Sequence, residues 1–448
     1  GINTTNLDPR NIKIYGNGGA MLPQKNSDFR YDDLHENAIF IEGESDGVFN
    51  SQDYILFYGK GPHDWIVNPS LQTAEHRQNI YSNVSYYFIT IGNTQGKRIT
   101  DAVVNSNPPT KVITNFDDFV FYEKEERNLF AIGTQWFGED FSLNDTQNFS
   151  VKFDNIDISS PIKVKVRGSA ISALTSTMNV SVNSSSVFSI FYPNVTNGSL
   201  TLGYANHNSA NVSVASSVID VSIAYNNNGN PGAKAYLDYI EVSGKKVLNA
   251  SGKQFSFRSF EAFNNSGVIE YQISNASNIT SLWDVTDFVN PIRINPLVIG
   301  SEYTFRENAG VLKEYIILND SDYFIPTLLD NSLIENQNLH ALRDVNYIVI
   351  TNKELEAQAQ RLASYHQSNS GLTTAVVELN QIYNEFGSGS PDNSAIRDFI
   401  KYISNTNTTS DGKLKYVCFF GDGSYDYKDR ITDNNNVVPV FESNQSFN

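Results

Sequence analysis

Hydrophobic and polar residues alternate along most of the first three quarters of the chain. Ile162, Val164 and Val166 interleave with two lysines and an arginine, and the same period of two recurs at residues 180–183. Alternation of this kind predicts antiparallel strands with one buried face. The Asn- and Gly-rich segment 226–232 predicts a turn between such strands. We therefore expect mostly β structure up to about residue 335.

Turn-rich segments divide this β region into two predicted domains. Residues 1–113 are predicted to form an N-terminal β domain, which the Asn- and Pro-containing segment 105–109 links to the next unit. Residues 114–335 carry short alternating strands at regular spacing, which favours a β-sandwich of jelly-roll type. Within the first domain the pattern predicts strands at residues 11–15, 38–42, 53–58 and 86–91.

A different pattern begins near residue 336. Residues 347–350 are a continuous apolar run, typical of a parallel strand that is covered on both faces. A helix is expected next, because Thr351 stands three residues before Glu354 at capping-box spacing and apolar residues then recur on one face. The β-branched segment 373–379 predicts the following strand.

A second helix and a third strand complete this unit. Ser390 is expected to cap the helix, with Pro391 at its first position and apolar residues from 396 to 403 on its buried face. Residues 415–420 predict the third strand. Two right-handed crossovers then place the strands near Tyr347, Val376 and Val417 side by side in a parallel sheet. Residues 336–448 are therefore predicted to be a parallel α/β domain.

The carboxyl edge of this sheet is the predicted site, because ligands gather at the carboxyl ends of parallel strands. An acidic, glycine-bearing loop spans residues 421–429 there. Gly421, Asp422 and Gly423 are predicted to shape the wall of a cleft. The two glycines permit a sharp bend, and the Asp422 carboxylate is expected to accept the amides of the turning backbone.

The loop also bears on metal and cofactor binding. Asp422, Ser424 and Asp426 have the spacing of the first three ligands of a calcium loop, but the required glycine and terminal glutamate are absent. We therefore predict no metal site, with Asp422 and Asp426 as the calcium candidates. No cofactor is expected, since the glycines of residues 16–19 lack the lysine and helix of a phosphate loop.

Composition narrows the classes of partner. Of 448 residues 40% are hydrophobic and 18% charged, which suits folded domains rather than a disordered chain. The formal net charge of −17 argues against nucleic acid and anionic membrane as direct partners. No run reaches the roughly 18 apolar residues that a transmembrane helix needs. The chain starts at Gly1 without a Met and stops at Asn448, and we expect both ends to come from a longer precursor.

Candidate catalytic residues are few. Cys418 is the only cysteine, and it is predicted to lie buried within the third strand, where a thiol is a small hydrophobe rather than a nucleophile. His340 precedes the first strand of the α/β domain, and His366 lies on the apolar face of its helix. The six histidines have no metal-ligand spacing. We therefore predict no catalytic, cofactor or metal residues in this chain.

The order of motifs in the last third resembles the first half of a gingipain-type cysteine peptidase domain. It runs through Asn-Gln-Asn-Leu-His (336–340), Tyr-Ile-Val-Ile-Thr (347–351), Ala-Ile-Arg-Asp-Phe-Ile (395–400) and Phe-Gly-Asp-Gly-Ser-Tyr-Asp-Tyr-Lys (420–428). Two earlier segments are similar to the surface sortases of the type IX secretion system within that family. These are Trp-Phe-Gly-Glu (136–139) and Trp-Asp-Val-Thr-Asp (283–287).

The resemblance implies a caspase-like α/β fold and a cell-surface cysteine endopeptidase on the extracellular face of the bacterial outer membrane. Such an enzyme removes the C-terminal signal domain of secreted cargo through a thioester and helps to attach the cargo to lipopolysaccharide. Its implied partners are these cargo domains and an outer-membrane β-barrel anchor. In the family the catalytic His and Cys follow the Gly-Asp loop, so they are expected downstream of Asn448, and this chain alone should be inactive.

The alternative is a non-catalytic surface adhesin or carbohydrate-binding protein. In that case the jelly roll would carry the function, and the α/β unit would be a scaffold. The sequence after Asn448 separates the two hypotheses, because a sortase needs a His-Gly strand end and a later cysteine.

Overall fold

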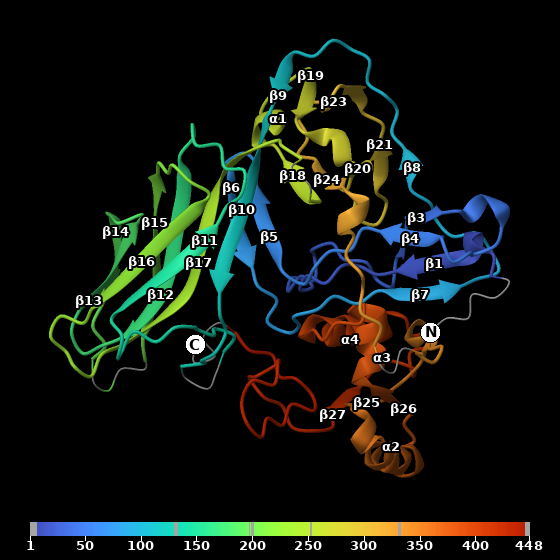
Figure 1. Ribbon diagram of the computed structural model, residues 1–448. Helices are drawn as coiled ribbons and strands as arrows, with labels where there is room; N and C mark the ends of the chain where they lie inside the picture. Colours follow the sequence, from blue (N-terminus) through green and yellow to red (C-terminus); the bar gives the residue numbers. More distant parts are fainter. Residues whose placement is uncertain are drawn as a thin grey trace.

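The computed structural model describes residues 7–129, 133–196, 198, 201–250, 253–329 and 333–443. Both chain ends, at Gly1 and Asn448, therefore lie outside the described part. The chain is mostly β up to residue 318 and α/β after residue 338, which confirms the predicted fold class (Figure 1). No helix in the described ranges is long and apolar enough to cross a membrane.

The N-terminal unit consists of one small sheet and two hairpins. The antiparallel sheet has the order β2-β1-β7. The first hairpin buries Ile39 and Ile41 against Ile12 and Ile14 of the sheet. The bounds are β1 (Ile12–Tyr15), β2 (Glu36–Asn37), β3 (Ile39–Glu42), β4 (Tyr54–Phe57), β5 (Asp64–Asn68), β6 (Thr73–Arg77) and β7 (Phe88–Ile91). The four strands predicted here are thus present.

A β-sandwich follows. One layer is a four-stranded sheet of order β11-β16-β13-β14, and the other holds β15, β12, β17 and β10. Alternating residues of both layers form one core, in which Val164 and Val166 are fully buried. The bounds are β10 (Asn115–Glu123), β11 (Thr146–Lys152), β12 (Ile162–Ile171), β13 (Ser176–Val182), β14 (Ser185–Tyr192), β15 (Tyr204–Val212), β16 (Val218–Asn226) and β17 (Lys234–Val247).

The region 114–335 contains a second core beyond this sandwich. The layer with β10 continues as β18-β24-β20-β21-β8, which makes a nine-stranded sheet, and a sheet of order β22-β23-β19-β9 covers the added part. Phe257, Tyr271, Phe305 and Tyr315 pack together between these layers. The bounds are β8 (Thr100–Asp101), β9 (Lys111–Ile113), β18 (Phe255–Arg258), α1 (Phe260–Phe263), β19 (Val268–Ile273), β20 (Ser281–Asp284), β21 (Ile292–Ile294), β22 (Leu297–Ile299), β23 (Glu302–Asn308) and β24 (Glu314–Leu318). The single predicted sandwich is therefore two units.

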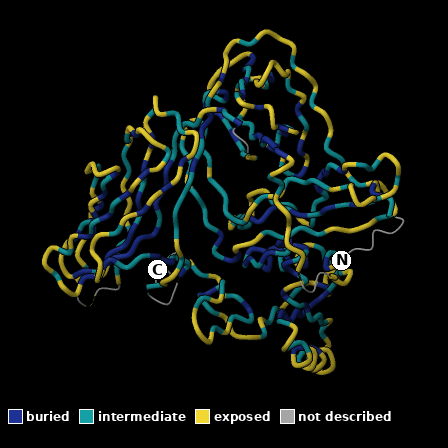
Figure 2. The backbone as a smooth tube through the Cα atoms, in the orientation of Figure 1, coloured by how far each residue is buried: buried dark blue, intermediate teal, exposed yellow. Residues whose placement is uncertain are grey.

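The α/β unit has the predicted parallel sheet. Strand β25 (Tyr347–Thr351) is central and pairs in parallel with β26 (Thr374–Glu378) and with β27 (Tyr416–Phe419). Every residue of β25 is buried. The helices are α2 (Glu356–Ser370), α3 (Leu379–Phe386) and α4 (Asn393–Asn405). Helix α2 exposes its outer face to solvent, whereas α3 and α4 lie between the sheet and the N-terminal unit (Figures 1 and 2).

The helix starts differ from the prediction. Asn352 rather than Thr351 supplies the cap, since its Oδ1 accepts from Leu355 N–H at 3.1 Å, while the Thr351 hydroxyl donates to Phe420 O. Asp392 rather than Ser390 caps α4 by accepting from Ser394 N–H. Helix α3 was not predicted. Both the predicted caps and the observed ones are residue types that can accept from a helix amide. The local sequence therefore does not decide which of two neighbouring residues caps the helix.

The N-terminal unit contacts both the sandwich and the α/β unit. Buried His76 of β6 contacts Glu123 and Glu241 of the sandwich, each at 2.6 Å. Burial by itself lowers the pKa of His76, but these carboxylates raise it to about 9.

On the side of the α/β unit, residues 17–33 of the N-terminal unit cross its surface as an extended strap. Leu22 N–H donates to Asp392 at 2.8 Å, Arg397 donates to the carbonyl of Pro23, and Arg30 pairs with Asp398.

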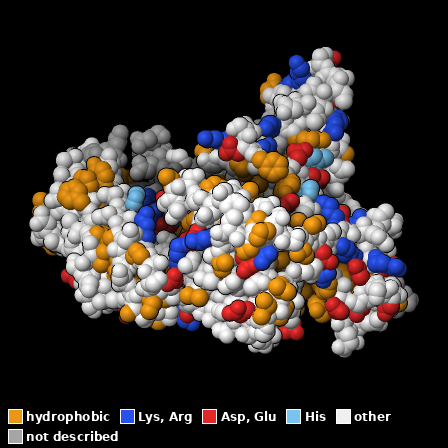
Figure 3. Space-filling view, turned by 90° about the horizontal axis from the view of Figure 1, so that it is seen from above, with side chains coloured by type: hydrophobic (Ala, Val, Ile, Leu, Met, Phe, Trp, Pro, Cys, Tyr) orange, Lys and Arg blue, Asp and Glu red, His pale blue; other side chains and the backbone are white. Residues whose placement is uncertain are grey.

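The surface reflects the low charged fraction of the sequence. On the face in Figure 3, acidic and basic side chains are scattered among hydrophobic ones, and most of the area is uncharged polar side chain or backbone. A charged fraction of 18% in the sequence is consistent with this mostly uncharged surface.

Candidate functional site at the carboxyl edge of the parallel sheet

A cavity of about 260 Å³ lies at the carboxyl edge of the sheet, where the sequence predicted the site. The residues after β25, the start of α3, the start of α4 and the segment 427–439 all line it. Tyr81 of the N-terminal unit adds a further wall. The cavity is therefore built by two units that are far apart in sequence.

Asp392 is the most deeply buried acid of this wall. Its two oxygens accept from Leu22 N–H of the strap and from Ser394 N–H of α4. Burial raises the pKa of Asp392 to about 6, and these hydrogen bonds oppose the rise. The same burial, with Asp392 nearby, raises the pKa of Tyr81 and Tyr383. The phenols therefore stay neutral and can donate hydrogen bonds.

Gly421 and Gly423 fit their predicted place in the loop after β27. A Cβ on Gly421 would lie 2.3 Å from a methyl carbon of Val437, and Gly421 has φ +146°. A Cβ on Gly423 would lie 2.5 Å from a methyl carbon of Val440. Both contacts are closer than real carbon atoms approach, so the absence of a side chain lets residues 437–440 pack against the loop.

Asp422 does not have the predicted role. Its side chain is exposed and, among the described residues, accepts from Asn435 Nδ2 at 3.2 Å, whereas its backbone carbonyl accepts from Val437 and Val438. The carboxylate that shapes the turn is Asp426. It is fully buried and accepts the amides of Arg430 and Ile431, the latter at 2.8 Å. The turn is thus built four residues later than predicted.

A buried ion cluster fixes this part of the loop to the sandwich. Arg430 Nη1 lies 3.1 Å from Asp426 Oδ1, and its Nη2 lies 2.5 Å from Glu125 Oε2. Lys428 Nζ lies 2.7 Å from the same Glu125 oxygen. The guanidinium of Arg430 also stacks over Trp136, 4.3 Å from the ring centroid. The Trp136 ring also stacks on Tyr425, with centroids 6.0 Å apart, so the 136–139 and 420–428 motifs meet in space.

The calcium candidates do not fit an ion. Arg430 and two backbone amides already occupy the Asp426 carboxylate, and a cation beside a guanidinium would be repelled. Asp422 is exposed and holds an amide. Within the described ranges, the ligand atoms that converge belong instead to Asp33, His340 and Glu385.

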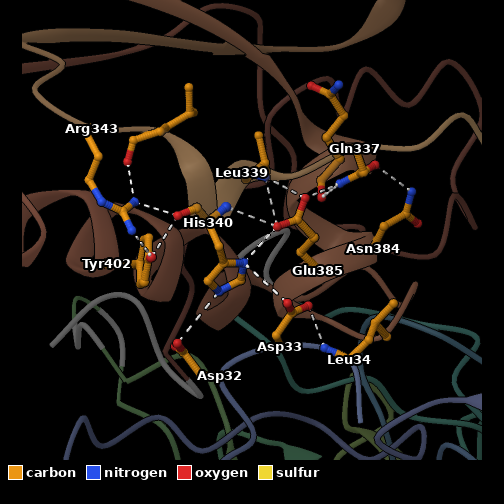
Figure 4. Close-up of polar contacts among 12 residues, drawn as sticks. Asp32, Asp33, Leu34, Gln337, Leu339, His340, Arg343, Asn384, Glu385 and Tyr402 are labelled. Carbon is orange, nitrogen blue, oxygen red and sulfur yellow. Dashed lines mark hydrogen bonds and ion pairs between the residues drawn. The ribbon is translucent and has the colours of Figure 1, made fainter. Parts of the chain in front are cut away.

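The contacts around His340 explain that convergence without a metal (Figure 4). Glu385 Oε2 lies 2.7 Å from His340 Nδ1, and the Glu385 carboxylate also accepts from Leu339 N–H and Gln337 Nε2. The Glu385 oxygens are therefore already occupied by hydrogen-bond donors. Asp33 and Asp32 of the strap lie 3.7 Å from the imidazole nitrogens.

The pKa values of His340 and Glu385 are both shifted from their ordinary values. Burial by itself lowers the pKa of His340, but the hydrogen bond with Glu385 and the charges of Asp33 and Asp32 hold it above its usual value. Burial favours neutral Glu385, yet the bonds from His340 and Gln337 hold its pKa below the usual range. The arrangement is an ion pair that joins three segments rather than a metal site.

Cys418 is less buried than predicted. It lies half-buried in β27, which is an edge strand of the described sheet, because only β25 pairs with it there. Its side chain joins the small core of Tyr347, Val349, Ala359 and Ala363. None of the described hydrogen bonds or ion pairs links it to a histidine, so it has no base beside it.

Sequence reasoning missed Glu125, Asp426 as turn-former, and the His340–Glu385 pair. The separations in sequence are large: 305 residues between Glu125 and Arg430, and 45 between His340 and Glu385. The only signal was that the 136–139, 336–340 and 420–428 motifs all stood out by resemblance.

Comparison with known families defines the class of the α/β unit. Residues 340–447 match the sequence model of Peptidase family C25. The α/β unit therefore matches a C25-type peptidase domain, as the gingipain-type resemblance predicted.

Nearly all of the chain shares its fold with a solved protein, the dimeric latent PorU from Porphyromonas gingivalis. The TM-score is 0.81 at 22% sequence identity, over 95% of this chain and 40% of that chain. The chain thus spans less than half the length of that PorU. None of the curated protein sequences matches the chain.

Carbohydrate-binding modules give much weaker structural matches. A CBM36 module in complex with calcium and xylotriose has a TM-score of 0.17 at 21% identity, over 22% of this chain and 73% of that chain. A family 35 module from Clostridium thermocellum has a TM-score of 0.19 at 13% identity, over 29% and 98%. Scores this low support no conclusion about sugar binding.

Proposed function

We propose that the chain is the N-terminal portion of a PorU-like sortase, a surface cysteine endopeptidase of a type IX secretion system. The observation that carries the proposal is the C25 match over residues 340–447, whose 420–428 motif forms part of the cavity wall at the carboxyl edge of the sheet. The shared PorU fold extends this support to the three β units that precede residue 320.

In this proposal the enzyme removes the C-terminal signal domain of secreted cargo and helps to transfer the cargo to surface lipopolysaccharide. It acts at the extracellular face of the outer membrane, and a β-barrel protein of the secretion system anchors it. Its partners are that anchor and the cargo signal domains. The β units then position the peptidase domain, and the acidic surface is kept away from anionic lipid.

The catalytic His and Cys are proposed to come from the sequence after Asn448. A cysteine peptidase needs a thiolate next to an imidazole base and donors for the oxyanion. Half-buried Cys418 and ion-paired His340 do not meet this requirement. The chain's own contribution is the shape of the cleft edge, through Gly421, Gly423 and Asp426.

The test uses the whole protein and a reporter cargo that carries a C-terminal signal domain. We expect the wild type to release the signal domain and to be blocked by substitution of the cysteine that follows a His-Gly segment. Cys418→Ala is the matched control and should retain activity. Absence of cleavage and of a cysteine acyl-enzyme in the intact wild type would contradict the proposal and favour the non-catalytic adhesin.

A further inference from the structure

Glu125 of the sandwich contacts two basic residues of the loop after β27. It follows β10, and its side chain is 9% exposed. One of its oxygens contacts both Lys428 Nζ at 2.7 Å and Arg430 Nη2 at 2.5 Å. Figure 1 shows the loop after β27 extending from the α/β unit toward the lower end of the sandwich. The ion cluster is thus a bridge between two separately folded units.

The burial of this bridge makes its geometry strict. Lys428 is 5% exposed and Arg430 is 15% exposed, so little water can replace a lost partner. Burial by itself raises the pKa of Glu125, but Lys428 and Arg430 hold it below the usual range, so the side chain remains a carboxylate at neutral pH. Buried charge pairs of this kind contribute little net stability, but removal of one partner is costly.

The ion cluster flanks Tyr427, a residue that lines the cavity. Tyr427 stands between Asp426 and Lys428 in sequence and lines the cavity. Its ring lies 4.8 Å from that of Tyr81, and its hydroxyl donates to Val440 O at 2.7 Å. Since both sequence neighbours of Tyr427 are members of the ion cluster or bound to it, the backbone at Tyr427 has little freedom.

We infer that Glu125 is a positioning residue of the cleft: through Lys428 and Arg430 the sandwich holds Tyr427 in place as one wall of the substrate cavity. The inference rests on the proposed function for its enzymatic part. Its structural part concerns only the described chain. Glu125 touches no reacting atom and acts through the loop.

The structural part is tested on the 448-residue chain by hydrogen exchange. In Glu125→Gln, the amides of residues 424–431 should exchange about tenfold faster or more, because the loop opens without its buried counter-charge. Strands β12 and β17 should be unchanged. Glu126→Gln is the matched control, since Glu126 is exposed and lies 3.8 Å from Lys124. Unchanged exchange of the loop in Glu125→Gln would overturn the inference.

A second variant covers the case in which Glu125→Gln fails to fold. Glu125→Leu with Lys428→Met removes the buried pair together, so no uncompensated charge remains between these two positions. This variant should fold and still show faster exchange in the loop. A folded double variant with wild-type exchange would also overturn the inference.

The enzymatic part is tested in the whole protein with the reporter cargo. Glu125→Gln should raise KM about tenfold and change kcat much less, because the substrate wall moves while the reacting groups stay in place. Alkylation of the catalytic cysteine by iodoacetamide, which releases iodide, should be unaffected. An unchanged KM, or a fall in kcat alone, would overturn the positioning role. If no peptidase activity exists at all, the proposed function fails, and the exchange experiment still decides the structural part.

Discussion

His340 Nδ1 lies 2.7 Å from Glu385 Oε2, and the imidazole stacks on the neighbouring ring of Phe386 at 4.5 Å. The pair joins the segment before β25 to the end of α3. Through Asp32 and Asp33 it also reaches the strap of residues 17–33. The His340–Glu385 ion pair therefore connects the N-terminal unit with two segments of the α/β unit.

Glu385→Gln should destabilise the α/β unit by about 2–4 kcal/mol, because a buried amide cannot accept the bonds of Leu339, Gln337 and His340 together. Hydrogen exchange of the β25 amides, measured as a function of denaturant concentration, gives the change in stability. Glu354→Gln, at an exposed position, should be neutral. Equal stability of the two variants would contradict the anchoring role of Glu385.

The contribution of His340 should depend on pH. Because its folded pKa lies above the ordinary value of 6.5, the stabilisation is fully present below pH 6.5 and is lost as the pH rises through the folded pKa. The stability difference between wild type and His340→Gln should therefore shrink as the pH rises above 6.5, by less than about 1 kcal/mol because the site is partly solvated. A difference that grows with pH would show that the imidazole acts in its neutral form.

Asp426→Ala should destabilise far more than Asp422→Ala. The first leaves two part-buried backbone amides and Arg430 Nη1 without their acceptor, while Arg430 keeps Glu125, at a cost of about 2–4 kcal/mol. The second removes one exposed contact and should cost less than about 0.5 kcal/mol. Thermal unfolding of both variants in parallel gives the comparison. The reverse order would restore the sequence-based assignment to Asp422.

Gly421→Ala should distort the loop after β27. The new Cβ would meet Val437, and φ +146° is a conformation that L side chains rarely adopt, so we expect a cost of about 2 kcal/mol or more. Gly61→Ala is the control, because a Cβ there meets nothing within 4 Å. Limited proteolysis between residues 421 and 440 should increase only in Gly421→Ala.

Cys418 should react with a disulfide reagent in the native chain, but about 10–100-fold more slowly than after denaturation, because half of its environment is packed against β25 and α2. Thiol titration with and without guanidinium measures both rates. Native reaction at the denatured rate would mean that β27 is open. No native reaction at all would restore the deeply buried position that the sequence predicted.

The sequence was sufficient for the elements that depend on local pattern. The apolar run at residues 347–350 predicted β25, and Gly421 and Gly423 predicted a sharp bend after β27, where Gly421 has φ +146°. Parallel order followed from the short crossovers. These features depend on burial and on φ, both of which leave a trace in nearby residues.

Choices between neighbouring polar residues were not predictable in the same way. Distant residues affect each choice. The Thr351 hydroxyl is taken by Phe420 O, Asp392 is held by Leu22 of the strap, and Arg430, the partner of Asp426, is held by Glu125. Each rejected residue could make the same local bond. Only the fold decides which carboxylate meets a guanidinium or a strap amide, so the site needed the structure.

The long sheet has a mechanical consequence. Strands β10 and β17 are in register over nine residue pairs, whereas β10 and β18 are joined at the single pair Asp117–Arg258. Side chains also cross this boundary, since Phe260 N–H donates to Asp117 Oδ2 at 2.7 Å and Arg258 Nη1 lies 3.7 Å from Asp118. The β10–β18 pairing is still the shortest ladder of the nine-stranded sheet, so a pulling force between the two cores should separate the strands there first.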